Sequence, residues 1–236
     1  MLSAKPRNPY STRSTPVYVG GYTVGFAGTA STTNVSLTSL TGGIASAPSE
    51  NDIVIVAYSA SSNFSGTPTV SGYTVIAQLL QLNAKYSKLH VSYKKMTATP
   101  DTSITLSGSS DFFNCTAAVY VFRGQDLTTP FDATATTDTG ISSGLVDPPA
   151  IFVPNAGGLI ICAGSVCSIT TGGAMGASYL SNFITETRDQ PVANDCSVGI
   201  GSIVSNGGSY NPGAWTFAND TANSSWCAVT MALRGA

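Results

Sequence analysis

The sequence predicts an all-β protein, specifically a jelly-roll-like antiparallel β-sandwich, and three observations support this fold class. The composition is the first: 236 residues include 31 Ser, 29 Thr and 24 Gly, and Thr favours strands while Ser and Gly supply turns. The second is a succession of short apolar runs that Gly, Asn, Ser or Pro interrupt, which is the pattern of strands joined by tight connections. The third is an internal duplication with a period of about 110 residues.

The first element is a polar segment at residues 1–16, with three prolines, three cations and no apolar periodicity. Such a segment is expected to form an extended arm rather than a helix or strand. We predict that the arm anchors the protein to a partner through its cations, Lys5, Arg7 and Arg13.

Strands are expected from residue 17 onward, and no helix is expected. In the first half they are predicted at 17–26, 34–40, 52–59, 73–82, 89–95, 103–106 and 115–123. In the second half they are predicted at 150–153, 159–165, 183–188, 196–204, 215–217 and 226–233. Residues 77–84 (AQLLQLNA) have some helical propensity, but their position between strand signals favours a strand or a bulge. Residues 130–154 are expected to link the halves, crossing from one sheet to the other.

The duplication is clearest in the buried strands. DIVIVA at 52–57 matches GLIICA at 158–163, and the halves end alike, in CTAAVYVFRG and CAVTMALRG. These matches define pseudo-repeats at about 46–124 and 150–236. A unit of four or five strands has an apolar face that it cannot cover alone, so we expect two units to pack face to face. Residues 17–236 are therefore predicted to form a single β-sandwich domain.

The charge composition excludes several classes of partner. Lys and Arg total 10 and Asp and Glu total 12, which gives a formal net charge of −2. A chain with so little positive charge is not expected to bind nucleic acid. At 42% hydrophobic residues the chain has enough apolar material for a core, and it contains no 18-residue apolar run, so membrane insertion is not expected. The first residues also lack an apolar stretch of signal-peptide length, so we expect no export by that route.

The residues that often perform catalysis or bind metals are sparse. His90 is the only histidine, and strand alternation places it on the presumed solvent face with Ser92 and Lys94, so we predict an exposed structural histidine rather than a general base. Most aspartates fall in turns, where they cap backbone amides, although a calcium site is an alternative. No catalytic residue, metal site or cofactor is predicted, and the chain is not expected to be an enzyme.

The five cysteines form no CxxC pair, which argues against a zinc site. Cys115, Cys162 and Cys227 lie within apolar strand patterns and are expected in the core. Because an odd number leaves one thiol unpaired, an interchain disulfide is the alternative, with Cys167 or Cys196 as the candidates.

Aromatic residues supply the candidate contact surface. Trp215 and Trp226 lie in strand patterns and are expected to pack in the core rather than stack on sugar rings. Tyr179, and Tyr210 and Asn211 in the Gly-rich segment 206–213 (NGGSYNPG), are the predicted contacts to a partner or a glycan.

Several of these segments resemble a duplicated β-sandwich family of virion structural proteins from tailed bacteriophages and prophages. The resemblance rests on IASAP at 44–48 before DIVIVA, GYTV at 72–75, VSYKK at 91–95, and VYVFRG at 119–124 followed by TPFD. It continues with PPAI at 148–151 and the closing strand at 226–234, so it covers about residues 35–236.

The resemblance implies a non-enzymatic structural protein that is synthesised in the bacterial host cytoplasm and displayed on the virion surface. Its role would be that of a capsid decoration, collar, spike or tail-fibre component, with the arm as virion anchor. The implied partners are capsid, neck or tail proteins and further copies of the chain, without a cofactor. The alternative is a receptor- or carbohydrate-binding domain of a fibre or spike that contacts a host-surface glycan. A third hypothesis, a glycan-active enzyme, requires two carboxylates that flank a scissile bond.

Overall fold

The computed structural model describes residues 13–28, 32–62, 66–83, 86–108, 111–141, 145–168, 173–188, 195–217 and 224–236. All regular elements in these ranges are β-strands, arranged in four antiparallel sheets. The all-β sandwich class predicted from the sequence is therefore confirmed. Within the same ranges, no helix is long and apolar enough to span a membrane.

The first half of the chain forms one large and one small sheet. The large sheet has the order β1 (Val17–Ala27), β8 (Phe112–Arg123), β3 (Ile53–Ser62), β6 (Tyr86–Lys95) and β5 (Thr74–Leu82). The small sheet has the order β2 (Thr32–Ser36), β7 (Ser103–Ser107) and β4 (Thr69–Val70).

The second half forms an equivalent pair of sheets. Its large sheet has the order β13 (Ser181–Arg188), β14 (Asp195–Tyr210), β11 (Ile151–Ser168), β16 (Ser225–Leu233) and β9 (Phe131–Ile141). Its small sheet has the order β10 (Leu145–Val146), β15 (Trp215–Phe217) and β12 (Met175–Gly176).

The outer strands of each half pair in a nested pattern. In the first half β1 pairs with β8, β2 with β7 and β3 with β6, whereas β4 pairs with β7 and β5 with β6. In the second half β9 pairs with β16, β10 with β15 and β11 with β14. The two halves thus have the same strand order, and each has its own small outer sheet.

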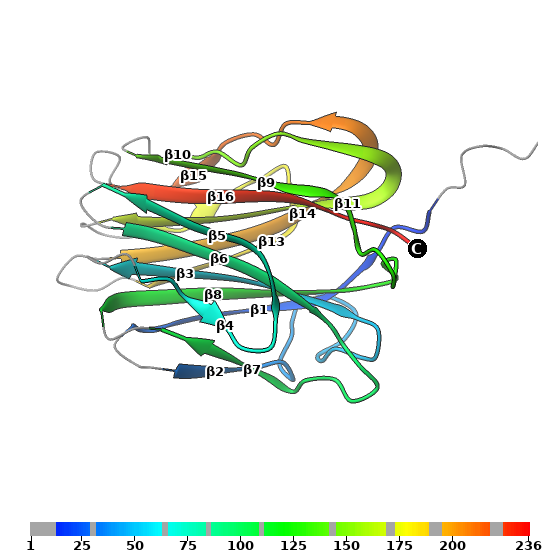
Figure 1. Cartoon of the computed structure of the whole chain (residues 1–236), viewed down its shortest axis with the longest axis horizontal. Coiled ribbons are helices and arrows are strands. Elements are labelled where there is room, and N and C mark those ends of the chain that lie inside the picture. The colour runs from blue at the N-terminus through cyan, green and yellow to red at the C-terminus, as the bar shows by residue number, and fades with distance from the viewer. Residues whose placement is uncertain are drawn as a thin grey trace, which may run out of the picture.

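The four sheets stack in layers, with the two large sheets in the middle (Figure 1). One apolar cluster fills the space between the large sheets, and a second and third lie between each large sheet and its small sheet. The sequence of strand β3 is continuously apolar because both of its faces are covered. Ile53 and Ile55 face the central cluster, whereas Val54 and Val56 face the cluster under the small sheet of the first half. Because both faces are covered, the alternation of a half-exposed strand is absent.

The structure also differs from the predicted elements. Residues Phe131–Ile141, expected to be a link between sheets, form the edge strand β9. Its side chains are mostly half-exposed threonines and alanines, so the sequence lacks the apolar run by which strands are recognised. The runs predicted at 150–153 and 159–165 belong to one long strand, β11. The two-residue strands β4, β10 and β12 were not predicted because they are too short to show a period.

Candidate functional site

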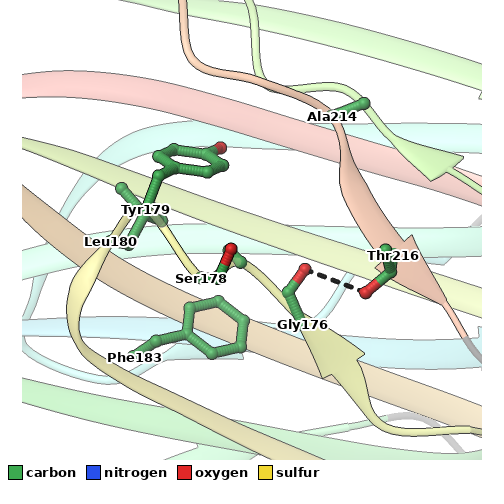
Figure 2. Close-up of a pocket in the computed structure, with 8 residues that line it drawn as sticks. Gly176, Ser178, Tyr179, Leu180, Phe183, Ala214 and Thr216 are labelled. Atoms are coloured by element: carbon green, nitrogen blue, oxygen red, sulfur yellow. Dashed lines mark hydrogen bonds between the residues drawn. The ribbon is translucent and has the colours of Figure 1, made fainter.

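The small sheet of the second half borders an open hollow of about 530 Å³, which we call the aromatic hollow (Figure 2). It lies between strand β15 and the segment that joins β12 to β13. None of the residues that line it has a charged side chain. They are Gly176, Ala177, Ser178, Tyr179, Leu180, Phe183, Ala214 and Thr216.

Tyr179 is held in the hollow by its hydroxyl group. The indole Nε1 of Trp215 donates a hydrogen bond to Tyr179 Oη at 2.7 Å, and Tyr179 Oη donates to the carbonyl oxygen of Gly213. Burial raises the pKa of the Tyr179 phenol above its ordinary value, so the ring stays neutral. Figure 2 shows the Tyr179 and Phe183 rings with Ser178 between them.

Trp215 lies beneath Tyr179 and Phe183, and two glycines leave room for its ring. Gly164 and Gly199 are register partners on β11 and β14. A Cβ atom added to Gly164 would lie 2.9 Å from Trp215 Cζ3, and one added to Gly199 would lie 3.2 Å from the same atom. Phe183 meets Trp215 edge to face, with ring centroids 5.2 Å apart. The glycine pair therefore allows the indole to pack directly on the sheet.

The corresponding place in the first half is filled by two large side chains. Tyr58 and His90 are register partners on β3 and β6. Tyr58 lies five residues after Ile53, just as Gly164 lies five residues after Leu159, which corresponds to Ile53 in the second half. His90 is only 1% exposed, so the predicted exposed histidine is wrong: the small sheet covers the face that alternation assigned to solvent. Burial lowers the pKa of His90 to about 4, which keeps the ring neutral near pH 7.

The structure brings only one of the predicted contact residues into the hollow. Tyr179 lines it, whereas Tyr210 and Asn211 do not. Tyr210 ends strand β14 and packs partly buried against the outer apolar cluster, while Asn211 is exposed beyond it. Sequence reasoning missed Phe183, which lies in a mainly polar strand, and the only sequence signal for the hollow is the glycine-rich segment before Tyr179.

The predicted core tryptophans are both buried, Trp215 at 0% and Trp226 at 7% exposure. Turn capping by aspartate is confirmed at Asp126, which accepts hydrogen bonds from the amides of Thr128 and Thr129 at 2.8 Å, whereas Asp138 lies in strand β9 and Asp101 pairs with Lys94. These two hydrogen bonds lower the pKa of Asp126. Among the described residues, no group of three or more His, Cys, Asp or Glu is placed to hold a metal ion.

Two of the predicted anchoring cations, Lys5 and Arg7, lie outside the described residues. The third, Arg13, is bound within the chain: its Nη1 donates to both carboxylate oxygens of Asp132, at 2.8 and 3.0 Å. Arg234 Nε donates to the same carboxylate at 2.6 Å, and Asn155 Nδ2 at 3.3 Å. We call these four residues the N-terminal clamp. Arg13 is thus engaged with the body and is not a free cation for a partner.

The interchain disulfide predicted for Cys167 or Cys196 does not fit the structure. Both residues are completely buried between the large sheets, and their sulfur atoms lie 3.3 Å from each other. A bond to another chain requires a thiol at the surface. Sequence spacing could not reveal this, because 28 residues separate two positions that face each other across β11 and β14.

A comparison of the chain with protein-family models, curated proteins and solved structures finds no match. The resemblance to tailed-phage virion proteins therefore stays a prediction, and the functional assignment depends on the geometry of the chain itself.

Proposed function

We propose that the chain is a non-enzymatic structural protein of a tailed-phage virion, displayed on the particle surface and attached through its N-terminal segment. The observation that carries this proposal is the N-terminal clamp. A buried carboxylate, 0% exposed at Asp132, binds one arginine from the start of the described chain and one from its end. The N-terminal segment is therefore joined to the body by charge-assisted hydrogen bonds, which are stronger than neutral ones.

Backbone contacts fix the same segment. The amide of Ser14 donates to the carbonyl of Ala236 at 3.0 Å. A Cβ atom at Gly235 would lie 2.3 Å from the carbonyl oxygen of Ser14, and one at Gly157 would lie 2.7 Å from that of Arg13. Gly235 and Gly157 thus leave room for the segment, because a side chain at either position would collide with its backbone. The segment just before β1 runs beside the C-terminus at one end of the layered stack (Figure 1).

The surface also suits assembly. Charged residues make up only 9% of the chain, and the edge strand β5 exposes Val75 (52%), Leu80 (37%) and Leu82 (49%). Apolar edge strands favour association with a neighbouring chain. Packing such a surface against a neighbour removes few charges from water, which keeps the desolvation cost low. This supports a homo-oligomer and contacts with other virion proteins.

Deletion of residues 1–12 is expected to abolish incorporation into particles while leaving the fold intact, because Arg13 and the clamp remain. The full chain and the deletion variant would be expressed in a phage-producing strain that lacks its own copy, and the purified particles would be analysed by mass spectrometry. A Lys5→Ala, Arg7→Ala double variant separates the effect of charge from that of length.

Three results are distinguishable in that experiment. Incorporation of the full chain but not of the deletion variant supports both the virion role and the anchor. Equal incorporation of both chains contradicts the anchor. Absence of the full chain from otherwise complete particles contradicts the virion role itself.

A second candidate function, binding of a host-surface glycan, is favoured by the aromatic hollow. Two aromatic rings and an uncharged lining suit the apolar face of a neutral sugar. The hydroxyl of Ser178 is exposed at the hollow, and that of Thr216 donates to the carbonyl of Gly176 at 3.2 Å, which leaves its lone pairs for a ligand hydroxyl.

For this function, Phe183→Ala is expected to weaken binding of a neutral glycan by about five- to tenfold, the value of one aromatic contact. Tyr179→Ala should have at least the same effect. Tyr210→Ala is the matched control, because Tyr210 lies outside the hollow, and its affinity should equal that of the unchanged protein. The measurement is a screen on neutral bacterial-surface glycans followed by calorimetric titration of the best ligand. No binding by the unchanged protein, or equal losses in all three variants, would contradict a glycan site here.

A further inference from the structure

The central core changes character along the strands. Near the chain termini it is filled by residues such as Ile55 and Ile161, but at the opposite end small hydroxyl and thiol side chains replace the apolar ones. We call this group the hydroxyl–thiol cluster. Its members are all buried and come from both halves: Ser59, Ser87, Thr116, Ser165, Cys167, Cys196 and Cys227.

Hydrogen bonds join the two halves within this cluster. Ser59 Oγ lies 3.0 Å from Cys196 Sγ, and Ser87 Oγ lies 3.0 Å from Ser165 Oγ. Cys196 Sγ also accepts from Thr116 at 3.7 Å and from the Cys167 thiol at 3.3 Å. Cys196 is therefore the centre of the cluster, with three hydrogen-bond partners around one sulfur atom.

The geometry of Cys167 and Cys196 matches what a disulfide requires. They are direct register partners on the antiparallel strands β11 and β14. Facing residues in such a pair have Cα atoms about 4.5–5.5 Å apart, which lies within the range of about 4.4–6.8 Å that disulfides occupy. Both thiols are free, and their sulfur atoms need to approach by only about 1.3 Å to reach bonding distance.

We propose that Cys167 and Cys196 form a reversible intrachain disulfide when the protein meets an oxidant, and that this bond fastens β11 to β14. Like other thiols, the pair is expected to stay reduced in a reducing cytoplasm and to oxidise in an oxidising medium. The modification is independent of the proposed virion role, because its chemistry depends only on the fold.

The position of the pair in the ladder explains how an oxidant reaches it. The next pair along, Ser168 and Asp195, is the last one of β11 and β14. Strand ends open locally at far lower cost than the whole protein unfolds. Cys167 also pairs with Ser225, where β16 begins, and Cys196 with Arg188, where β13 ends. Opening of this end of the sheet, where all four strands have an end, therefore exposes both thiols, although they are buried in the closed state.

The chemistry balances with a peroxide as oxidant. The Cys196 thiolate attacks the peroxide oxygen, which gives a sulfenic acid and, from hydrogen peroxide, one water after protonation. The Cys167 thiol then attacks that sulfur, its proton leaves with the displaced hydroxyl as a second water, and the S–S bond forms. Although burial opposes ionisation, hydrogen bonds from Cys167, Ser59 and Thr116 lower the pKa of the Cys196 thiol, which fits its role as the attacking group.

The other three cysteines differ from Cys196 in thiol acidity and from the Cys167–Cys196 pair in their contacts, and burial raises the pKa of the Cys167 thiol as well. Burial raises the pKa of Cys115, Cys162 and Cys227 to about 12, which disfavours their thiolates. Cys227 donates to the carbonyl of Ser87 at 3.4 Å, and Cys115 accepts from the hydroxyl of Tyr58 at 3.4 Å. Neither contact brings two sulfur atoms together.

The test treats the full-length folded chain with hydrogen peroxide and then counts free thiols in denaturant. The expected count falls from five to three, and peptide mapping should find one disulfide between the peptides that contain Cys167 and Cys196. The thermal midpoint should rise by roughly 5–10 °C, because a cross-link over a long loop restricts the unfolded chain, and dithiothreitol should reverse the shift.

Cys167→Ser should abolish the peroxide-induced shift, while Cys227→Ser, a buried cysteine of the same cluster, should retain it. Mapping of the unchanged protein decides the question even if a variant fails to fold. Five free thiols after treatment, a disulfide that involves another cysteine, or a cross-linked dimer would each overturn the proposal.

Discussion

Asp132→Asn is expected to lower the free energy of unfolding by about 3–5 kcal/mol, the loss that follows when one partner of a buried ion pair is removed. The Asp132 side chain is 0% exposed, and the Arg13 and Arg234 side chains that it binds are each 24% exposed. The asparagine has nearly the same shape but no charge, so two largely buried guanidinium groups lose their anion. The measurement is denaturant unfolding, and trypsin cleavage after Arg13 should become faster because the segment is no longer held.

The matched control is Asp101→Asn, the same substitution in a more exposed ion pair. Asp101 binds Lys94 at 2.7 Å, with side-chain exposures of 27% and 32%, and exposed pairs contribute about 0.2–1 kcal/mol. If Asp132→Asn costs no more than Asp101→Asn, the clamp does not hold the N-terminal segment, and the main support for the anchor is lost.

Lys88→Met is expected to stabilise the protein by about 1–3 kcal/mol at pH 7. Lys88 is 0% exposed, and among the described residues no atom accepts a hydrogen bond from its Nζ. The ammonium lies 4.3 Å from the ring centroid of Phe112, a contact that offsets only part of the cost of burial. Methionine fills a similar volume without a charge.

The gain should depend on pH. Burial lowers the pKa of Lys88 from 10.5 to about 8, so the folded state binds this proton less tightly than the unfolded state does. The penalty is therefore complete below pH 8, decreases between pH 8 and 10.5, and vanishes above pH 10.5. The stabilisation by Lys88→Met should follow the same course in denaturant titrations at several pH values.

Lys95→Met is the control for this prediction, because Lys95 is an exposed lysine on the same strand, β6. Its effect should stay within about 0.5 kcal/mol at every pH. A destabilising Lys88→Met would mean that the ammonium has a compensating partner. A gain that does not change with pH would mean that it does not come from removing the buried charge.

The covered strands were predictable because their signal is local. The IVIVA run of β3 is apolar at every position, and both of its faces are buried. Strand β9 was not predictable in this way, because it lies at a sheet edge and buries little on either side. Backbone pairing with β16 holds β9 in the sheet, and the pattern of its side chains does not reveal this pairing.

The candidate site was predictable only in part. Tyr179 was predicted because aromatic side chains on a neutral, hydroxyl-rich surface suit contact with a sugar ring, but Phe183 and Trp215 reach it from strands that are not adjacent in sequence. Trp215 packs there because Gly164 and Gly199 face each other. This pairing depends on the register between β11 and β14, which the sequence of one strand does not specify.

By itself, the sequence determined that the chain is built of antiparallel strands, that these begin at Val17, and that similar runs recur in both halves. Only the tertiary structure decided which strand faces are covered and which distant residues meet. It buried His90 and Lys88 beneath residues outside their own strand, enclosed Asp132 between two arginines, and placed Cys167 against Cys196. The physical reason is that periodicity describes one strand, whereas burial and pairing depend on layers that the strand cannot specify alone.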